Sequence, residues 1–118
     1  MRNQMPQDAT ITHTMVGEAA VVHISGQMRE MGADALREEL DELIAAGHFK
    51  LIFDLGDVSF VSSTGLGQMM RAYRQAVGNG GYLRVVNPQP LVEEVFRFTK
   101  LHTLIGIFPT VEAAIAGA

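Results

Sequence analysis

The first part of the chain alternates apolar and polar residues with the period of a β-strand. Residues 10–16 are rich in β-branched side chains, and a second run of this kind covers residues 19–24. The pair Gly17 and Glu18 lies between the two runs and is typical of a tight turn. This pattern predicts a two-stranded hairpin.

Between residues 32 and 46 the spacing changes to that of an amphipathic helix. Large aliphatic residues recur on one helix face, at Leu36, Leu40, Leu43 and Ile44. Gly47 then supplies a stop signal. The next run, residues 50–55, is almost continuously apolar, which is typical of a strand that is covered on both faces. This run is therefore predicted to lie at the centre of a sheet.

A second helix is predicted to begin at the hydroxyl-rich segment Ser62-Ser63-Thr64 and to end at the glycine-rich residues 78–81. The Ser63 and Thr64 side chains are expected at the N-cap, because hydroxyl groups accept hydrogen bonds from the unpaired amides of a first turn. The apolar stripe of this helix is predicted to consist of Leu66, Met69, Met70, Tyr73 and Val77. Its outward positions are Arg71, Arg74 and Gln75.

Four further elements complete the pattern. They are a strand at residues 82–86, a helix that starts near the prolines of residues 87–90, a short strand at residues 104–108 and a terminal helix at residues 111–115. The order ββαβαβα(β)α predicts an α/β fold, with a mixed sheet of four to five strands and about four helices. Residues 1–9 are expected to form a flexible amino tail, and residues 10–118 to form a single domain.

Composition narrows the possible functions. The 118 residues include nine Lys and Arg, thirteen Asp and Glu, and no cysteine, and the net charge is −4. Thiol catalysis and disulfides are thus excluded, and the acidic charge argues against nucleic-acid binding. No apolar run approaches the roughly 20 residues of a membrane span, and the amino end does not resemble a signal peptide. We therefore expect a cytoplasmic protein without direct membrane insertion.

The pattern predicts no catalytic residues, cofactor or metal site. The four histidines lack a metal-ligating spacing, and they are His13, His23, His48 and His102. Residues 65–70 match only the first two glycines of a dinucleotide fingerprint, and the loop has no P-loop lysine. A hydrolase that combines Ser63 with a histidine and Asp54 or Asp57 stays as an alternative, although the G-x-S-x-G elbow is absent.

The segment with the most information is the hydroxyl cluster that precedes Gly65-Leu66-Gly67. Helix capping accounts for one or two hydroxyls, whereas three adjacent ones exceed what a cap requires. A phosphate group at this position would be favoured by the unpaired amides and by the helix dipole. Gly65 and Gly67 leave little side-chain cover, so a partner's backbone could approach closely.

Residues 58–67, preceded by residues 51–55 and followed by residues 80–88, resemble the STAS domain of bacterial anti-sigma factor antagonists. The similarity extends from about residue 10 to residue 116, so it implies a STAS domain over residues 10–118. It also implies partner switching, in which the unmodified protein binds an anti-sigma serine kinase and releases a sigma factor or another effector. The kinase then phosphorylates a serine at the start of the second helix, which matches Ser63, and a serine phosphatase restores it.

Two departures from the family pattern concern this site. Ser62 stands where the family usually has Asp, and Gln27-Met28-Arg29 replaces the usual Glu-Leu-Asp. A non-phosphorylated STAS accessory subunit that binds the ATPase of a lipid-transport ABC system is therefore the alternative function. The residues predicted to bind a partner are Ser62, Ser63, Thr64, Gly65, Leu66, Gly67, Met28 and Arg71.

Overall fold

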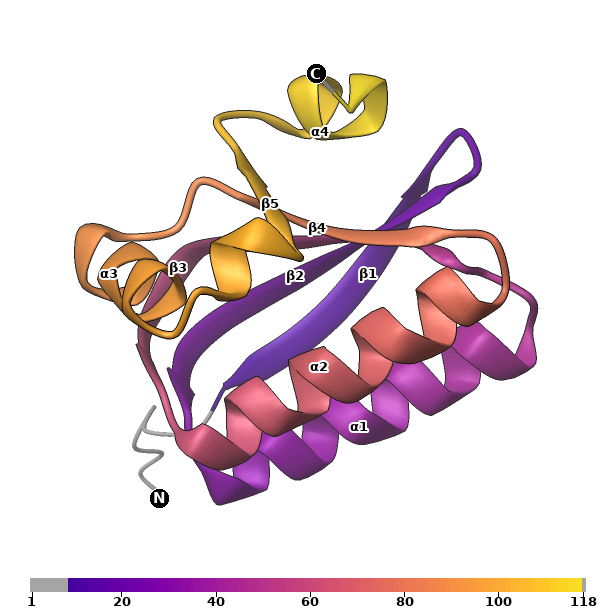
Figure 1. The fold of residues 1–118 in the computed structure, drawn as a ribbon. Coiled ribbons are helices and arrows are strands. Elements are labelled where there is room, and N and C mark those ends of the chain that lie inside the picture. Colours follow the sequence, from indigo (N-terminus) through magenta and orange to yellow (C-terminus); the bar gives the residue numbers. More distant parts are fainter. Residues whose placement is uncertain (1–8, 118) are drawn as a thin grey trace.

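The computed structural model describes residues 9–117, which contain five strands, four α-helices and one short 3₁₀ helix (Figure 1). The strands are β1 (Thr10–Val16), β2 (Ala19–Met28), β3 (Lys50–Val61), β4 (Tyr82–Val86) and β5 (Gly106–Phe108). The helices are α1 (Glu30–Ala45), α2 (Ser63–Gly78), α3 (Pro90–Phe98), the 3₁₀ helix η1 (Leu101–Thr103) and α4 (Val111–Ala116). The predicted flexible tail lies outside the described residues apart from Ala9, and it stays a prediction.

The five strands form one mixed sheet in the order β1-β2-β3-β4-β5. The β1–β2 hairpin is antiparallel, and the other neighbouring pairs are parallel. The predicted α/β class is thereby confirmed, and β3 lies at the centre as its apolar run indicated. Leu51, Ile52 and Phe53 are all fully buried, because successive side chains of this strand point into apolar layers on opposite faces of the sheet.

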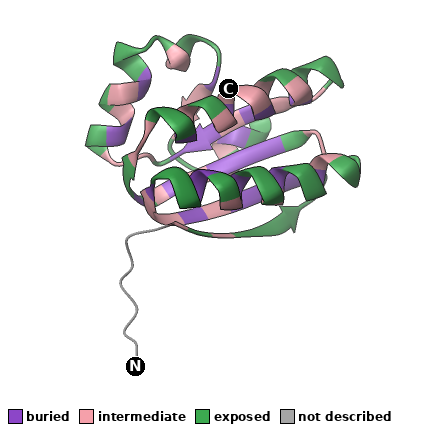
Figure 2. Cartoon of the chain, turned by 90° about the horizontal axis from the view of Figure 1, so that it is seen from below, coloured by how far each residue is buried: buried purple, intermediate pink, exposed green. Residues whose placement is uncertain are grey.

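The two faces of the sheet are covered unequally. Helices α1 and α2 lie side by side along one face, and α4 covers part of the other (Figure 1). The larger core lies beneath α1 and α2, and Val92 and Phe96 of α3 extend it. On the opposite face Ala114 of α4 belongs to a smaller apolar cluster with Val21 and Ile52. Figure 2 shows the outer surfaces of the helices exposed and the central strands buried.

Strands β2 and β3 are longer than predicted. Strand β3 continues through Asp57 and Ser59 to Val61, and β2 continues to Met28. The two strands stay paired over this length, with register shifts between His23 and Ser25 and between Gly26 and Gln27. The polar residues Asp57 and Ser59 are thus tolerated within the strand.

Two further predictions need correction. Val77 was expected on the apolar stripe of α2, but it is 48% exposed, and the small residues Ala72 and Ala76 face the core instead. The last strand begins at Gly106 rather than at Leu104, because η1 and its following turn occupy the preceding residues. The error at Val77 arises because the close packing of a helix on a sheet selects residues by size as well as by hydropathy.

The longer strands decide where the hydroxyl cluster lies. Because β2 and β3 are parallel, their carboxyl ends, Met28 and Val61, meet at the same end of the sheet. Helices α1 and α2 begin directly after these residues, so their first turns are neighbours (Figure 1). This end of the molecule, with the starts of α1 and α2, is called the carboxyl rim below.

Candidate functional site

Ser62 is the N-cap of α2. Its backbone is extended, and its Oγ accepts a hydrogen bond of 3.1 Å from the amide of Gly65. The amide of Ser62 in turn donates to the carbonyl oxygen of Met28 at 2.8 Å, which ties the cap to the end of β2. The prediction that Ser63 and Thr64 occupy the N-cap is therefore wrong by one residue, because the strand runs to Val61 and the helix starts at Ser63.

Ser63 and Thr64 are the first two residues of α2, and both are exposed. Neither hydroxyl makes a hydrogen bond within the part of the chain that the structure describes. The first turn of α2 contains no acidic residue. Because Ser62 already caps the helix, the Ser63 hydroxyl is not needed for capping. Ser63 is exposed beside the unpaired amides and the positive end of the helix dipole.

Gly65 and Gly67 have different surroundings, so the lack of a side chain has a different effect at each position. Gly65 is buried, and a Cβ atom there would lie 2.5 Å from Cγ of Met28 and 3.2 Å from Val61. Gly65 therefore allows α2 to pack on β2, rather than opening the surface to a partner as expected. Gly67 is exposed, and a Cβ atom there would meet nothing within 4 Å. Only Gly67 matches the expectation of an open surface.

Other predicted partner-binding residues lie deeper. Met28 is 0% exposed beneath Gly65, so its side chain is inaccessible in this structure, and its predicted role in partner binding stays a prediction. Leu66 is half-buried against the core. Arg71 donates to Asp41 of α1 at 2.8 Å, and its other nitrogen atoms donate to glutamines of its own helix. Arg71 thus joins α2 to α1, and a partner contact for it stays a prediction.

The carboxyl rim also presents a pair of side chains that the sequence did not predict as a site. Arg29 occupies the N-cap position of α1, and its guanidinium carbon lies 5.0 Å from the ring centroid of Phe60. The Arg29 Nε donates to Oε1 of Gln27 at 2.7 Å. Phe60 is 40% exposed, which is high for a large aromatic residue. The departure from the family pattern at residues 27–29 was the only signal for this pair.

The hydrolase alternative loses its proposed nucleophile. His23 Nδ1 lies 3.4 Å from Oδ2 of Asp54, and its Nε2 lies 3.1 Å from Oγ1 of Thr14. The structure therefore brings one histidine and one of the two candidate aspartates together, but with Thr14 on the open sheet instead of Ser63. Within residues 9–117 there is no cluster of three or more side chains suited to hold a metal ion. No helix among those residues is long and apolar enough to cross a membrane.

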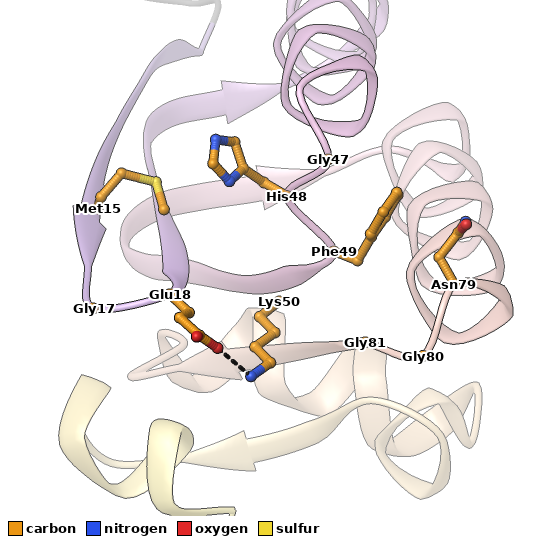
Figure 3. A pocket seen from close by; sticks show the side chains of 10 residues that line it. All are labelled: Met15, Gly17, Glu18, Gly47, His48, Phe49, Lys50, Asn79, Gly80 and Gly81. Carbon is orange, nitrogen blue, oxygen red and sulfur yellow. Dashed lines mark hydrogen bonds and ion pairs between the residues drawn. The ribbon is translucent and has the colours of Figure 1, made fainter.

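A surface pocket lies at the opposite end of the strands (Figure 3). It is formed by the β1–β2 turn, the segment that enters β3 and the turn that enters β4. Glu18 and Lys50 point toward one another across it and form an ion pair of 2.7 Å. The hydrogen bond to Lys50 lowers the pKa of Glu18, and the same bond raises the pKa of Lys50. Because both charges are already paired and several lining residues are glycines, the pocket offers little chemistry for a ligand.

Comparison with known proteins agrees with the fold. A family model described as STAS domain matches residues 10–114. The anti-sigma-B factor antagonist of Bacillus subtilis is 32% identical over 94 residues, which are 80% of this chain and 85% of that protein. Two relatives from Thermotoga maritima and Thermotoga neapolitana are 29% identical over 75 residues, and the match spans just under two thirds (66%) of their own length.

Solved structures extend the comparison to three dimensions. An anti-sigma factor antagonist from Mycobacterium paratuberculosis has a TM-score of 0.85 at 24% identity, over 98% of this chain and 97% of that chain. The unphosphorylated form of the anti-sigma factor antagonist SpoIIAA has a TM-score of 0.79 at 25% identity, over 90% of this chain and 93% of that one. The phosphorylated form of Bacillus SpoIIAA has a TM-score of 0.73 at 25% identity, over 91% of this chain and 97% of that chain.

Proposed function

The chain belongs to the STAS domain family, and from this premise we propose that it acts as an anti-sigma factor antagonist by partner switching. The unmodified domain binds a regulatory anti-sigma serine kinase at the carboxyl rim and so releases the kinase's other target. Phosphorylation of Ser63 ends the contact, and a serine phosphatase restores it. The domain performs no catalytic step in this cycle, which operates in the cytoplasm, where a kinase finds ATP.

The observation that carries this proposal is that two adjacent serines have different roles. Ser62 holds the cap of α2, whereas the Ser63 hydroxyl is exposed and makes no hydrogen bond among the described residues. A kinase can therefore reach Ser63 without breaking a contact of the fold. The relative SpoIIAA, which has been solved in phosphorylated and unphosphorylated forms, supports a modification on a domain of this shape.

Electrostatics explains how the modification would end binding. A phosphate adds about −1.5 to −2 charges at neutral pH, and the start of a helix tolerates them within the domain itself. When a partner covers it, the same dianion loses hydration and repels acidic groups of the partner, at a cost of several kcal/mol. Because about 1.4 kcal/mol changes an affinity tenfold, such a cost lowers the occupancy of the complex by orders of magnitude.

The proposal is tested by incubating the domain with the serine kinases of its source organism and ATP, followed by intact-mass measurement. We expect one added phosphate in the wild-type chain, none in Ser63→Ala, and one in the matched control Thr64→Ala. Phosphate that persists in Ser63→Ala would contradict the assignment.

Because no carboxylate stands next to Ser63 in the sequence, a second candidate function is retained, that of an accessory subunit of a lipid-transport ABC system. Ser62 replaces the acid that the family usually has there, and the structure shows it acting as the cap. If the chain copurifies with the ATPase of an ABC transporter, recruits no kinase and gains no phosphate, the accessory-subunit function is favoured instead.

A further inference from the structure

Arg29 is a cation on the carboxyl rim that pairs with no carboxylate of residues 9–117. Its partners are a neutral amide, Gln27 at 2.7 Å, and the face of the Phe60 ring at 5.0 Å. Arg71 and Arg97, in contrast, each hold a carboxylate at 2.8 Å. The positive charge of Arg29 is thus presented outward beside an exposed aromatic ring.

We propose that Arg29 and Phe60 form a docking contact for a protein partner that presents a carboxylate next to an apolar side chain. The inference rests on the proposed function, because the partner in question is the kinase that modifies Ser63. It goes further by assigning the sign of the charge that the partner must carry. Arg29 is in this sense a residue that determines specificity.

Backbone contacts place this pair beside Ser63. Met28, the neighbour of Arg29, accepts the amide hydrogen bond of Ser62 at 2.8 Å, and Ser62 is the neighbour of Ser63. Strand register adds a second link, because Gln27 pairs with Phe60 and Met28 pairs with Val61. A kinase whose active site reaches the Ser63 hydroxyl therefore covers the guanidinium and the ring as well.

Charge complementarity identifies the occupant. Gln27 is neutral, and Arg29 carries a positive charge at this part of the rim. Glu30 follows as the first residue of α1, where the helix dipole favours it. With Arg29 present the two charges balance, and without it this part of the rim is negative. Arg29 therefore decides whether a partner's carboxylate is attracted or repelled.

The pair is also suited to binding by its geometry. Arginine and aromatic residues are enriched at the centres of protein interfaces. Stacking on Phe60 and the bond to Gln27 hold the guanidinium in place before a partner arrives, so less side-chain entropy is lost on binding. Phosphate on Ser63 would then act twice, because it repels the partner's carboxylate and draws Arg29 toward itself.

The first experiment measures association of the domain with the kinase that phosphorylates it, at two salt concentrations. We expect Arg29→Gln to weaken binding about tenfold and Arg29→Glu to weaken it further, mostly through a slower association rate at low salt. Arg29→Lys should retain most of the binding. Phe60→Ala should weaken binding by about as much as Arg29→Gln does. The matched control is Arg74→Gln, which removes an exposed cation from the outward side of α2.

The outcomes separate the two proposals. If the kinase phosphorylates Ser63 but binds Arg29→Glu as tightly as the wild type, the docking inference is overturned while the proposed function stands. If no kinase binds or modifies the wild-type chain, both fail. Thermal unfolding of each variant shows whether a loss of binding reflects loss of the fold.

A second experiment needs no partner. Phosphoserine is incorporated at position 63 during translation, and the phosphate is titrated by ³¹P NMR in the wild-type and Arg29→Gln backgrounds. We expect Arg29→Gln to raise the second phosphate pKa by about 0.2 to 0.7 of a unit, whereas Arg74→Gln leaves it unchanged. Equal values in the wild type and Arg29→Gln would overturn the placement of Arg29 beside Ser63, and with it the proposal.

Discussion

At the scale of single residues, three adjacent hydroxyls divide into one structural group and two exposed ones. Ser62 accepts the Gly65 amide at 3.1 Å, while Ser63 and Thr64 stand on the first turn of α2 without such a bond among the described residues. Local sequence could not assign these roles, because any of the three is a good N-cap. Ser62 is the cap because β3 ends at Val61 and α2 begins at Ser63.

The first prediction concerns this cap. Ser62→Ala should lower the free energy of unfolding by about 1 kcal/mol, because the Gly65 amide loses its acceptor. Ser62→Asp should retain the stability, since aspartate caps as well as serine and is favoured by the helix dipole. Urea denaturation at neutral pH measures both, with Ser63→Ala as the control that should change stability by less than about 0.5 kcal/mol. A loss in Ser63→Ala as large as in Ser62→Ala would contradict these roles.

Gly67 provides a test in which stability and binding move in opposite directions. Its substitution by alanine should stabilise the domain by about 0.5–1 kcal/mol, because the new Cβ atom lies in open space and alanine favours a helix. The same methyl group should weaken kinase binding if a partner approaches this surface closely. Denaturation and binding measured on one preparation of Gly67→Ala check both effects, and unchanged binding would remove Gly67 from the docking surface.

At the scale of elements, the connection from α2 to β4 depends on a close backbone approach. A Cβ atom at Gly81 would lie 1.9 Å from the carbonyl oxygen of Phe49, which accepts the Tyr82 amide at 2.9 Å. Gly81→Ala should therefore destabilise the domain by about 3 kcal/mol or more, since backbone must move to relieve the clash. Gly78→Ala is the matched control, because its Cβ atom would meet nothing within 4 Å. Similar denaturation midpoints for the two variants would show that Gly81 is not so confined.

The ion pair between Glu18 of the hairpin turn and Lys50 of β3 predicts a dependence on pH. The bond to Lys50 lowers the pKa of Glu18 below 4.5, so its stabilising effect is present above that value and is lost as the pH falls through the folded-state pKa. Glu18 raises the pKa of Lys50 above 10.5, so that effect is lost as the pH rises through the folded-state value. The stability difference between wild type and Glu18→Gln should therefore be present at neutral pH and absent in strong acid.

The effect should be small, because both groups are exposed to solvent. NMR titration of the Lys50 side chain gives a sharper readout, since its pKa should move down toward 10.5 in Glu18→Gln. Glu112→Gln, an exposed change in α4, is the control and should leave Lys50 unchanged. A Lys50 pKa that does not respond to Glu18→Gln would show that the pair does not persist in solution.

At the scale of the whole molecule, the proposed switch alters a surface without altering the fold. Ser63→Asp should leave the thermal midpoint nearly unchanged, because an acid is favourable at a helix start, while it weakens kinase binding through its negative charge. Calorimetry and a binding assay measure the two effects, with Ser63→Ala as the uncharged control. Binding of Ser63→Asp equal to that of the wild type would count against a mechanism based on charge.

The extent of prediction differed between the fold and the site. Element order, the central position of β3 and the start of α3 near the prolines of residues 87–90 followed from local periodicity and from start and stop signals. The predicted contacts of Met28 and Gly65 with a partner stay predictions, and both residues face inward where β2 passes under α2. Nothing in the local pattern around either residue shows that the other lies against it.

The sequence by itself determined the α/β class, the succession of strands and helices, and the presence of a hydroxyl cluster at the start of a helix. Each of these depends on residues within one or two turns or strands of one another, so a local pattern encodes it. Only the tertiary structure decided that Ser62 caps, that Ser63 is exposed, and that Arg29 stacks on Phe60. These features depend on the register between β2 and β3, which are distant in the chain and pair with two register shifts, so the local sequence of either strand does not show which residues lie opposite.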